Sequence, residues 1–515
     1  MNLLEKTIGV IAPQTALKCQ HAKRQLAILN SGYSHHGASR TKKSLLGWVF
    51  GGGSPREDID DNIKVLRERS RDLYMGTPIA TGALKTLRTN VVGSGLKVKP
   101  SLDYEFLGMT DEEASKWETN VEREFNLWAE SVNCDMTRLN DFYELQQLIF
   151  LSWMMNGDAF ALLPYNKRPN MPYDLRIQLV EADRICTPYE MSWRDNVSGG
   201  VEIDNNGEVV AYHIAQFHPL SSRQIKREWI RVEAFGKSTG RRNVIHMMEC
   251  ERIDQRRGVP ILAPVIESLK QLGRYTDAEL MAAVVSGMFT VFIETENPND
   301  APLGEMIDDG QRVDDGDANS LEMGNGAIVA LAPGEKANTA NPNRTNAAFD
   351  GFVSSVCRQI GAALEIPSEL LLKQFTSSYS ASRAALLEAW KMFRMRRTWL
   401  ANDFCQPIYS EWLTEAVAKG RIYAPGFFDS PIIRKAYSQA EWSGPSPGQL
   451  DPVREANAAA LRVENGFSTR AKETVELTGG DFYKNHRQRV KEEKLRKEGG
   501  LIPDVKAGQV LGVQE

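Results

Sequence analysis

Two short stretches carry the residue types of catalytic motifs. The stretch "AFGKST", Ala234–Thr239, ends like a phosphate-binding loop, but the first glycine of that motif would fall at Arg231. Without this glycine the backbone cannot wrap a phosphate in the usual way. The stretch "GPSPG", Gly444–Gly448, has the spacing of a nucleophile elbow, yet its two prolines oppose the strand and the helix that an elbow needs on either side. Neither stretch predicts a nucleotide site or a catalytic serine.

The other residues that could do chemistry also lack their partners. Ser380 precedes Arg383 in "SSYSASR", where a serine-based mechanism would need a lysine, and a guanidinium stays protonated and cannot act as a base. His35 and His36 stand in a polar stretch without further ligands nearby, and the six cysteines include no CxxC pair. We therefore expect reduced thiols, no metal site, no cofactor and no catalytic residue: a protein that is not an enzyme.

A different kind of segment lies between two of the expected helices. The stretch "KQFTSSYSASRAALLEAW", Lys373–Trp390, is first polar and hydroxyl-rich and then changes to a strong helix pattern. Lys373 is the one cation of its first half. Leu386, Trp390, Phe393 and Leu400 recur at helical spacing and predict the buried stripe of the helix that follows. The polar half therefore reads as an exposed loop held between helices.

Composition limits the classes of protein that this chain can belong to. It has 515 residues, of which 42% are hydrophobic and 25% charged, so it can bury a sizeable core in several domains. A formal net charge of -5 argues against a simple basic nucleic-acid binder, but it allows a protein past which nucleic acid slides. The longest apolar run, Leu280–Ile293, is too short to span a bilayer. We expect a soluble protein without a signal peptide.

The expected elements define an α+β protein. After a polar arm, helices and then short alternating strands fill residues 60–255, with a hairpin turn at "DNNG", Asp204–Gly207. Two of these helices are expected at about Asp111–Val132 and near Asp141–Asn156. "NVVGSGLKVKP" predicts two strands around a glycine turn, Asn90–Pro100. A long helix then leads to an acidic segment, Glu294–Glu335, whose end "LEMGNGAIVALAPGE" predicts two more strands. A second helix, Ala347–Ile366, follows.

The order of these elements and several stretches resemble the lambda-like portal proteins of tailed bacteriophages. The stretches are "RERSRDLYMGTPIATGALKTLRTNVVGSGLKVKP", "MNGDAFALLP", "IQLVEADRI", "VIHMMECERIDQRRGVPILAPVIESLKQLGRYTDAEL", "SSYSASRAALLEAW" and "QLDPVREANAAALRVENGFST". The resemblance covers about residues 1–475. It implies an α+β portal fold with wing, stem, clip and crown regions, assembled as a ring around a central channel.

The resemblance also implies a division of the chain. The expected parts are an N-terminal arm (1–58), a wing α+β domain (59–257), a first stem helix (258–286), a clip (287–346), a second stem helix (347–366), a tunnel loop (367–380), a wing helix with its following segment (381–442) and a crown-like C-terminal region with a tail (443–515).

The implied function assigns roles to particular residues. The tunnel loop would face DNA through Lys373, Gln374, Ser377, Ser378 and Tyr379. The clip would dock the terminase or the connector through Asp308, Asp309, Asp314, Asp315 and Asp317. Contacts between subunits would involve Arg383, Arg394 and Arg397.

The expected partners follow from the same resemblance. They are further copies of the chain in a ring, usually of twelve, double-stranded DNA that passes non-specifically, the terminase large subunit, head–tail connector proteins, and the major capsid and scaffolding proteins, with no membrane. The ring would lie at the portal vertex of the virion after assembly in the host cytoplasm. The alternatives are another head–tail connector component, which is usually shorter, and a DNA-packaging enzyme, which would need a complete phosphate loop or a carboxylate metal cluster.

Overall fold

The computed structural model describes residues 51–222, 228–287, 291–295, 335–339, 348–375, 378–449 and 451–501, with a few positions before residue 46. The chain divides into two compact units, Met1–Asp58 and Ile59–Glu515. In the first unit the structure describes the 3-10 turn Lys43–Leu45, and a π-helical turn, Arg56–Asp60, crosses the boundary. All elements discussed below belong to the second unit.

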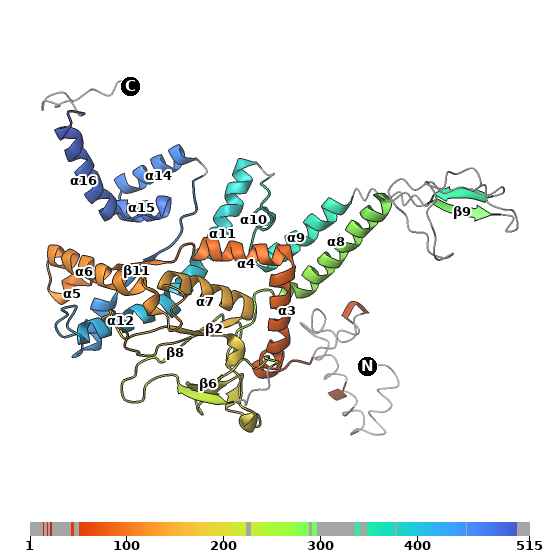
Figure 1. Cartoon of the computed structure of the whole chain (residues 1–515), viewed down its shortest axis with the longest axis horizontal. Helices are drawn as coiled ribbons and strands as arrows, with labels where there is room; N and C mark the ends of the chain where they lie inside the picture. The colour runs from red at the N-terminus through yellow and green to blue at the C-terminus, as the bar shows by residue number, and fades with distance from the viewer. Residues whose placement is uncertain are drawn as a thin grey trace, which may run out of the picture. The chain divides into compact units, whose positions relative to one another are not determined.

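The second unit begins with a group of helices around an apolar core (Figure 1). These helices are α3 (Ile63–Gly76), α4 (Pro78–Val91), α5 (Tyr104–Leu107), α6 (Asp111–Ala129) and α7 (Phe142–Asn156). The start of α6 is fixed by a capping box in which Thr110 and Glu113 satisfy each other's backbone N–H groups, and Asp141 and Glu144 do the same for α7. Both helix starts agree with the predicted ones.

Aromatic side chains dominate the middle of this core. Phe125 of α6 packs edge-on against Phe142 and Trp412, with ring centroids 5.7 Å and 5.0 Å apart. Trp128 is fully buried, and its indole N–H donates to the Leu175 carbonyl at 3.0 Å. Such buried rings contribute large apolar areas and fix the relative positions of α6, α7 and the later helix α12 (Gln406–Ala418).

The strands form small antiparallel sheets beside the helices. One sheet has the order β3–β2–β8 and another the order β4–β5–β6–β7. Their strands are β2 (Asp158–Leu162), β3 (Gln178–Val180), β4 (Val197–Ser198), β5 (Val201–Ile203), β6 (Val209–Ala215), β7 (Trp229–Glu233) and β8 (Val244–Met248). The predicted hairpin turn joins β5 to β6, with the Asp204 carboxylate accepting from Asn206 and Glu208 N–H groups at 2.8 Å. A second, smaller apolar cluster fills the space between the sheets.

A helical hairpin carries the chain away from this body. Helix α8 (Ile266–Gly287) leads to strand β9 (Val291–Thr295), which pairs with β10 (Glu335–Thr339), and helix α9 (Phe349–Ala363) returns. The two helices lie side by side, and the β9 hairpin lies beyond their ends (Figure 1). Tyr275 of α8 stacks on Phe349 of α9 with centroids 5.7 Å apart.

The remaining elements return to the body and then form a C-terminal group. They are α10 (Ser368–Leu372), α11 (Tyr379–Leu400), a π-helical turn (Ala401–Cys405), α12, α13 (Pro431–Ser438), β11 (Ala440–Ser443), α14 (Pro452–Glu464), α15 (Arg470–Thr478) and α16 (Phe482–Glu498). Strand β11 pairs with β1 (Lys97–Pro100), and this pairing ties the end of α13 to the helical core. Short 3-10 helices occur at Val132–Cys134, Ala182–Arg184, Tyr189–Met191 and Ala263–Val265.

Some elements differ from the sequence-based predictions. Residues expected to form a strand at Asn90 instead complete α4, because packing buries Val91 and Val92 fully and overrides their β propensity. The first long helix starts at Ile266 rather than near residue 258, and the segment 367–380 contains the short helix α10. The strands expected within Leu321–Glu335 lie outside the described residues, apart from the start of β10.

Candidate functional site

The segment between α9 and α11 holds the residues predicted to face DNA. Pro367 is the N-cap of α10, and Lys373, the residue that follows the helix, is in the left-handed conformation with φ 55° and ψ 34°. The N–H groups of Lys373 and Gln374 both donate to the Glu369 carbonyl, which closes the turn. Lys373 and Gln374 are exposed. The lysine is therefore held at a sharp, well-defined bend rather than in an irregular loop.

The far end of this segment is the start of α11. Ser378 caps the helix by accepting from the Ala381 N–H at 3.4 Å, and Tyr379 is 46% exposed. The Arg383 guanidinium donates to the Tyr379 hydroxyl at 3.3 Å. Ser377 lies outside the described residues. The structure thus places Lys373, Gln374, Ser378 and Tyr379 on one short exposed connection.

Sequence reasoning missed one exposed side chain in this connection. Phe375 is 55% exposed, although it is apolar and large. An exposed ring beside the bend is available for contact with another chain.

A cleft of 550 Å³ lies between α9 and α11, next to the start of α10. Its polar rim includes Arg358, Glu388 and Lys391, and the last two form an exposed ion pair of 2.6 Å. Its floor is apolar, with Ile366 and Met392. The mixed lining has no catalytic constellation of the kind that a nucleophile and a base would form.

The three arginines predicted to join subunits make contacts within the chain. Arg383 lies 3.4 Å from Glu455 of α14, and Arg394 lies 3.4 Å from Glu476 of α15. These two pairs link α11 to the C-terminal helices. Both arginines remain partly exposed, so contacts to a neighbouring subunit stay a prediction for them.

Arg397 differs more clearly from the expectation. Its guanidinium donates to the backbone carbonyls of Val91, Asn90 and Pro445 at 2.8 to 3.0 Å. Burial and the neighbouring Arg394 lower the pKa of Arg397 to about 10. Because its donors satisfy the end of α4, Arg397 serves the interior of its own subunit.

The acidic residues predicted to dock the terminase or the connector, Asp308, Asp309, Asp314, Asp315 and Asp317, lie outside the described residues. The structure does describe the strands that border their segment. Glu335 of β10 faces Thr295 of β9 in an antiparallel register. The described strands before and after the segment are therefore paired with each other.

The outer part of the helical hairpin exposes apolar side chains. Leu280 is 64% exposed, Met281 61% and Val284 46% on α8, and Phe352 is 49% exposed on α9. Adjacent apolar residues on one exposed surface are a common mark of a protein–protein interface.

A buried ionic cluster joins the helices to the sheets, and no local sequence pattern indicated it. Asp158 begins β2 and is fully buried; its carboxylate lies 2.7 Å from Arg67 of α3 and 2.6 Å from Arg257. Arg257 also donates to the carbonyls of Ile185 at 2.6 Å and Ala182 at 2.8 Å. Both arginines are almost fully buried as well. The cluster holds the loop before α8 against strand β2 and the segment Ala182–Ile185.

The charges of this cluster depend on one another. Burial alone would raise the pKa of Asp158, but the guanidiniums of Arg257 and Arg67 outweigh it and hold that pKa well below its usual range. Burial lowers the pKa of Arg67 to about 10, with a further lowering by Arg257. Burial also lowers the pKa of His246, whose ring stacks on Phe160 with centroids 4.2 Å apart. The cluster is a structural joint rather than a proton-transfer site.

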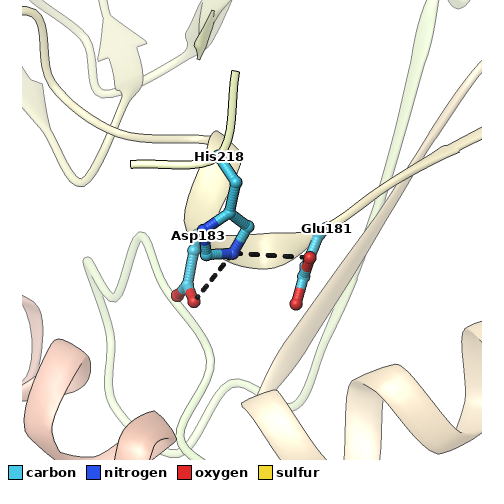
Figure 2. A group of neighbouring side chains, drawn as sticks. All are labelled: Glu181, Asp183 and His218. Carbon is cyan, nitrogen blue, oxygen red and sulfur yellow. Dashed lines mark ion pairs between the residues drawn. The ribbon is translucent and has the colours of Figure 1, made fainter. Parts of the chain in front are cut away.

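One group of side chains has the composition of a metal site. Figure 2 shows that the His218 Nε2 atom points between the carboxylates of Glu181 and Asp183, at 3.4 Å and 3.6 Å. The Asp183 carboxylate also accepts from Arg71 at 2.5 Å and from Arg67 at 3.5 Å. Because two guanidiniums already satisfy this carboxylate, the group forms an ion-pair network.

The two stretches that resemble catalytic motifs have different surroundings in the structure. The residues "AFGKST" form a turn between β7 and β8, where a phosphate loop would need a helix to follow. Strand β11 does precede "GPSPG", contrary to the expectation, but α14 begins only at Pro452. The described cysteines Cys134, Cys186, Cys250, Cys357 and Cys405 form no disulfide bond. Among the described helices, none has the length and apolar content that crossing a membrane requires.

Comparison with known proteins identifies the class. Residues 41–397 match the family model described as "Phage portal protein, lambda family". The chain is 26% identical to portal protein B of Escherichia phage lambda over 495 residues, 92% of this chain and 91% of that protein. It is 25% identical to the portal protein of Escherichia phage N15 over 495 residues, 92% of each chain.

A solved structure is also similar. It is the neck of a native GTA particle computed with C12 symmetry, with a TM-score of 0.42 and 12% identity over 81% of this chain and 93% of that chain.

The match to the family model covers more than half of the chain, and the α+β fold agrees with it. This is a portal protein of a tailed phage. Within that class, the chain belongs to the lambda family of phage portal proteins.

Proposed function

We propose that copies of this chain form a ring-shaped channel at one vertex of the capsid, through which genomic DNA is packaged and ejected. The ring would contain twelve subunits, dock the terminase motor and the head–tail connector through residues 308–317, and contact the major capsid and scaffolding proteins. Its role would be structural rather than catalytic, in the virion, after assembly in the host cytoplasm. Membership of the portal family is the observation that carries the proposal.

The exposed apolar side chains of α8 and α9 support assembly into a ring. Leu280, Met281 and Val284 occupy neighbouring positions on the outer part of α8 and remain open to solvent in the single subunit. Covering a large apolar side chain contributes on the order of 1.5 to 3 kcal/mol. A neighbouring copy that packs its own hairpin beside this one would bury them.

The charge of the chain supports a channel with little friction. Each phosphate contact made by Lys or Arg adds affinity that is independent of sequence, and many such contacts would hold DNA still. The net charge of -5 per chain gives a ring of twelve copies on the order of sixty negative charges. Against this background, the exposed Lys373 would give each subunit one transient phosphate contact at the tunnel loop.

The test of the proposal is the assembly of the full chain. We expect the purified protein at micromolar concentration to form closed rings, seen in images down the particle axis as a central hole, with a mass that is a multiple of 57.6 kDa. The measurement is repeated with the capsid and scaffolding proteins coexpressed, because rings can require them. A chain that stays monomeric in both preparations would contradict the proposal.

A further inference from the structure

A small cationic notch lies between α6 and α16, on elements other than the connection that carries Lys373. The notch has a volume of 360 Å³, and its lining comes from one face of α6 and from α16: Ser115, Lys116, Thr119, Asn120, Arg123 and Arg487. Residues 115, 119 and 123 follow each other at four-residue spacing, so their side chains lie in one row. The lining combines three cations with two hydroxyls and an amide, and contains no carboxylate.

The two arginines of the notch are available to bind an anion. Within the described residues, neither Arg123 nor Arg487 lies within ion-pair distance of a carboxylate, and both are exposed. The Arg487 Nε atom donates to the Tyr483 carbonyl at 3.4 Å, which leaves its terminal nitrogens for an anion. Lys116 pairs with Glu112 at 2.8 Å, but these side chains are 73% and 81% exposed. An exposed pair of this kind contributes little and exchanges easily for another anion.

Polar contacts hold α16 in the position that completes the notch. Lys484 forms an ion pair of 2.5 Å with Glu122 of α6, and Lys99 of β1 lies 4.3 Å from the centre of the Tyr483 ring. Arg487 stands one turn after Lys484 and therefore projects over the same side of α6. The helix itself buries no residue. Its first two turns are thus placed by charge, and they present Arg487 to the α6 face.

The charge of α16 is opposite in sign to that of the whole chain. The helix "FYKNHRQRVKEEKLRKE" contains seven Lys and Arg residues against three Glu, whereas the chain carries a net charge of -5. A local positive helix on an acidic protein attracts a polyanion to that surface. Guanidinium groups with nearby hydroxyl and amide donors are well suited to phosphate oxygens.

We propose that the notch binds backbone phosphates of double-stranded DNA, at a site separate from Lys373. Arg123 and Arg487 would hold the phosphate oxygens from opposite walls, and Ser115 and Asn120 would donate hydrogen bonds from the floor, since the Thr119 hydroxyl already donates to the Ser115 carbonyl at 2.8 Å. This inference rests on the proposed function only for the choice of DNA as the molecule that carries the phosphate.

The experiment compares two pairs of substitutions in the full chain. Arg123→Gln with Arg487→Gln removes two charges from the notch, and Lys491→Gln with Lys497→Gln removes two from α16 outside it. Glutamine keeps a good helix propensity in both pairs. Binding to a 30-base-pair duplex is followed by fluorescence anisotropy between 50 and 200 mM NaCl. The logarithm of the association constant falls linearly with the logarithm of the salt concentration. Removal of one phosphate contact should make this slope less steep by about 0.9.

We expect the notch pair to reduce affinity and salt dependence more than the control pair does. Equal reductions in both pairs would show that only the overall charge of α16 matters, and would overturn the notch. Inorganic phosphate, titrated at constant ionic strength, is the second arm. A notch pair that abolishes phosphate binding but keeps the DNA slope of the unmodified protein would overturn the assignment to DNA. Ring images of every variant separate these outcomes from a failure of assembly, which would contradict the proposed function instead.

Discussion

Two glycines allow two backbone segments to touch beside the buried ionic cluster. A Cβ atom on Gly258 would lie 1.9 Å from the Gly157 carbonyl oxygen, and one on Gly157 would lie 2.3 Å from the Gly258 carbonyl oxygen. Gly157 also has a φ of +90°, a conformation that other residues avoid. Their neighbours Asp158 and Arg257 form the ion pair at the centre of the cluster. The close contact of the glycines is therefore what permits the buried salt bridge.

Replacing one of these glycines should destabilise the protein strongly. We expect Gly258→Ala to lower the free energy of unfolding by about 3 kcal/mol, because backbone atoms cannot move aside as a flexible side chain can. Gly273→Ala in α8 is the matched control, since nothing lies within 4 Å of its added Cβ. That change should raise helix stability by up to about 1 kcal/mol. The measurement is the thermal unfolding midpoint of each variant. Similar midpoints for Gly258→Ala and Gly273→Ala would show that no steric clash arises at Gly258.

Asp158 should make stability depend on acid pH. Its pKa is lower in the folded chain than in the unfolded chain, where it is about 3.9. The stability that it contributes is therefore fully present above that value and is lost as the pH falls toward the folded pKa. We expect Asp158→Asn to cost about 3 to 5 kcal/mol at neutral pH, because Arg67 and Arg257 would stay buried without their counter-charge. As the pH is lowered below about 4, the unfolding midpoint of the Asp158→Asn variant should fall less steeply than that of the unmodified protein.

An exposed ion pair provides the control for Asp158. Glu388 and Lys391 lie 2.6 Å apart with side chains that are 71% and 74% exposed. Glu388→Gln should therefore change stability by less than about 1 kcal/mol. Equal effects of Asp158→Asn and Glu388→Gln would mean that the buried cluster has no special part in holding the fold.

At the scale of elements, local rules predicted those features that are determined locally. The hairpin at Asp204–Gly207 and the helix starts at Asp111 and Phe142 were predictable because turn and cap residues act over a few positions. The end of α4 was not, because burial of Val91 and Val92 is decided by the core around them. Helix α10 was missed because its five residues are too few to show a periodic pattern.

The candidate site divides in the same way. The position of Lys373 on an exposed connection before α11 could be predicted from the change of pattern near Ser380, close to the observed start of α11 at Tyr379. The left-handed conformation of Lys373 could not, because nothing in its residue type favours it. In the cluster around Asp158, Arg67 lies 91 positions before Asp158 in the sequence and Arg257 lies 99 positions after it. No local stretch of sequence therefore contains both partners of either ion pair. The use of Arg397 within its own subunit depends likewise on α4, whose Val91 precedes it by 306 positions.

At the scale of the whole molecule, the proposed ring would give Lys373 a role that it cannot have in one subunit. One lysine per subunit, set at the same bend in every copy, would form a circle of single charges around the channel axis. Such a circle can touch the phosphates of passing DNA without the many contacts that would stop it. The left-handed backbone at Lys373 costs about 1 to 2 kcal/mol for a residue with a Cβ atom, so charge and backbone must be tested separately.

Three substitutions at position 373 separate these two effects. Lys373→Arg keeps the charge, Lys373→Ala removes the charge but keeps the strained bend, and Lys373→Gly removes both charge and strain. We expect rings from all three variants, because Lys373 is exposed and lies outside the apolar core. The Ala and Gly variants should package or retain less DNA than the unmodified protein, and the Arg variant should behave normally. The amount of protected DNA per particle is the measurement. Normal packaging and retention in both the Ala and Gly variants would exclude Lys373 from DNA handling, and a defect in the Gly variant alone would assign the effect to the backbone.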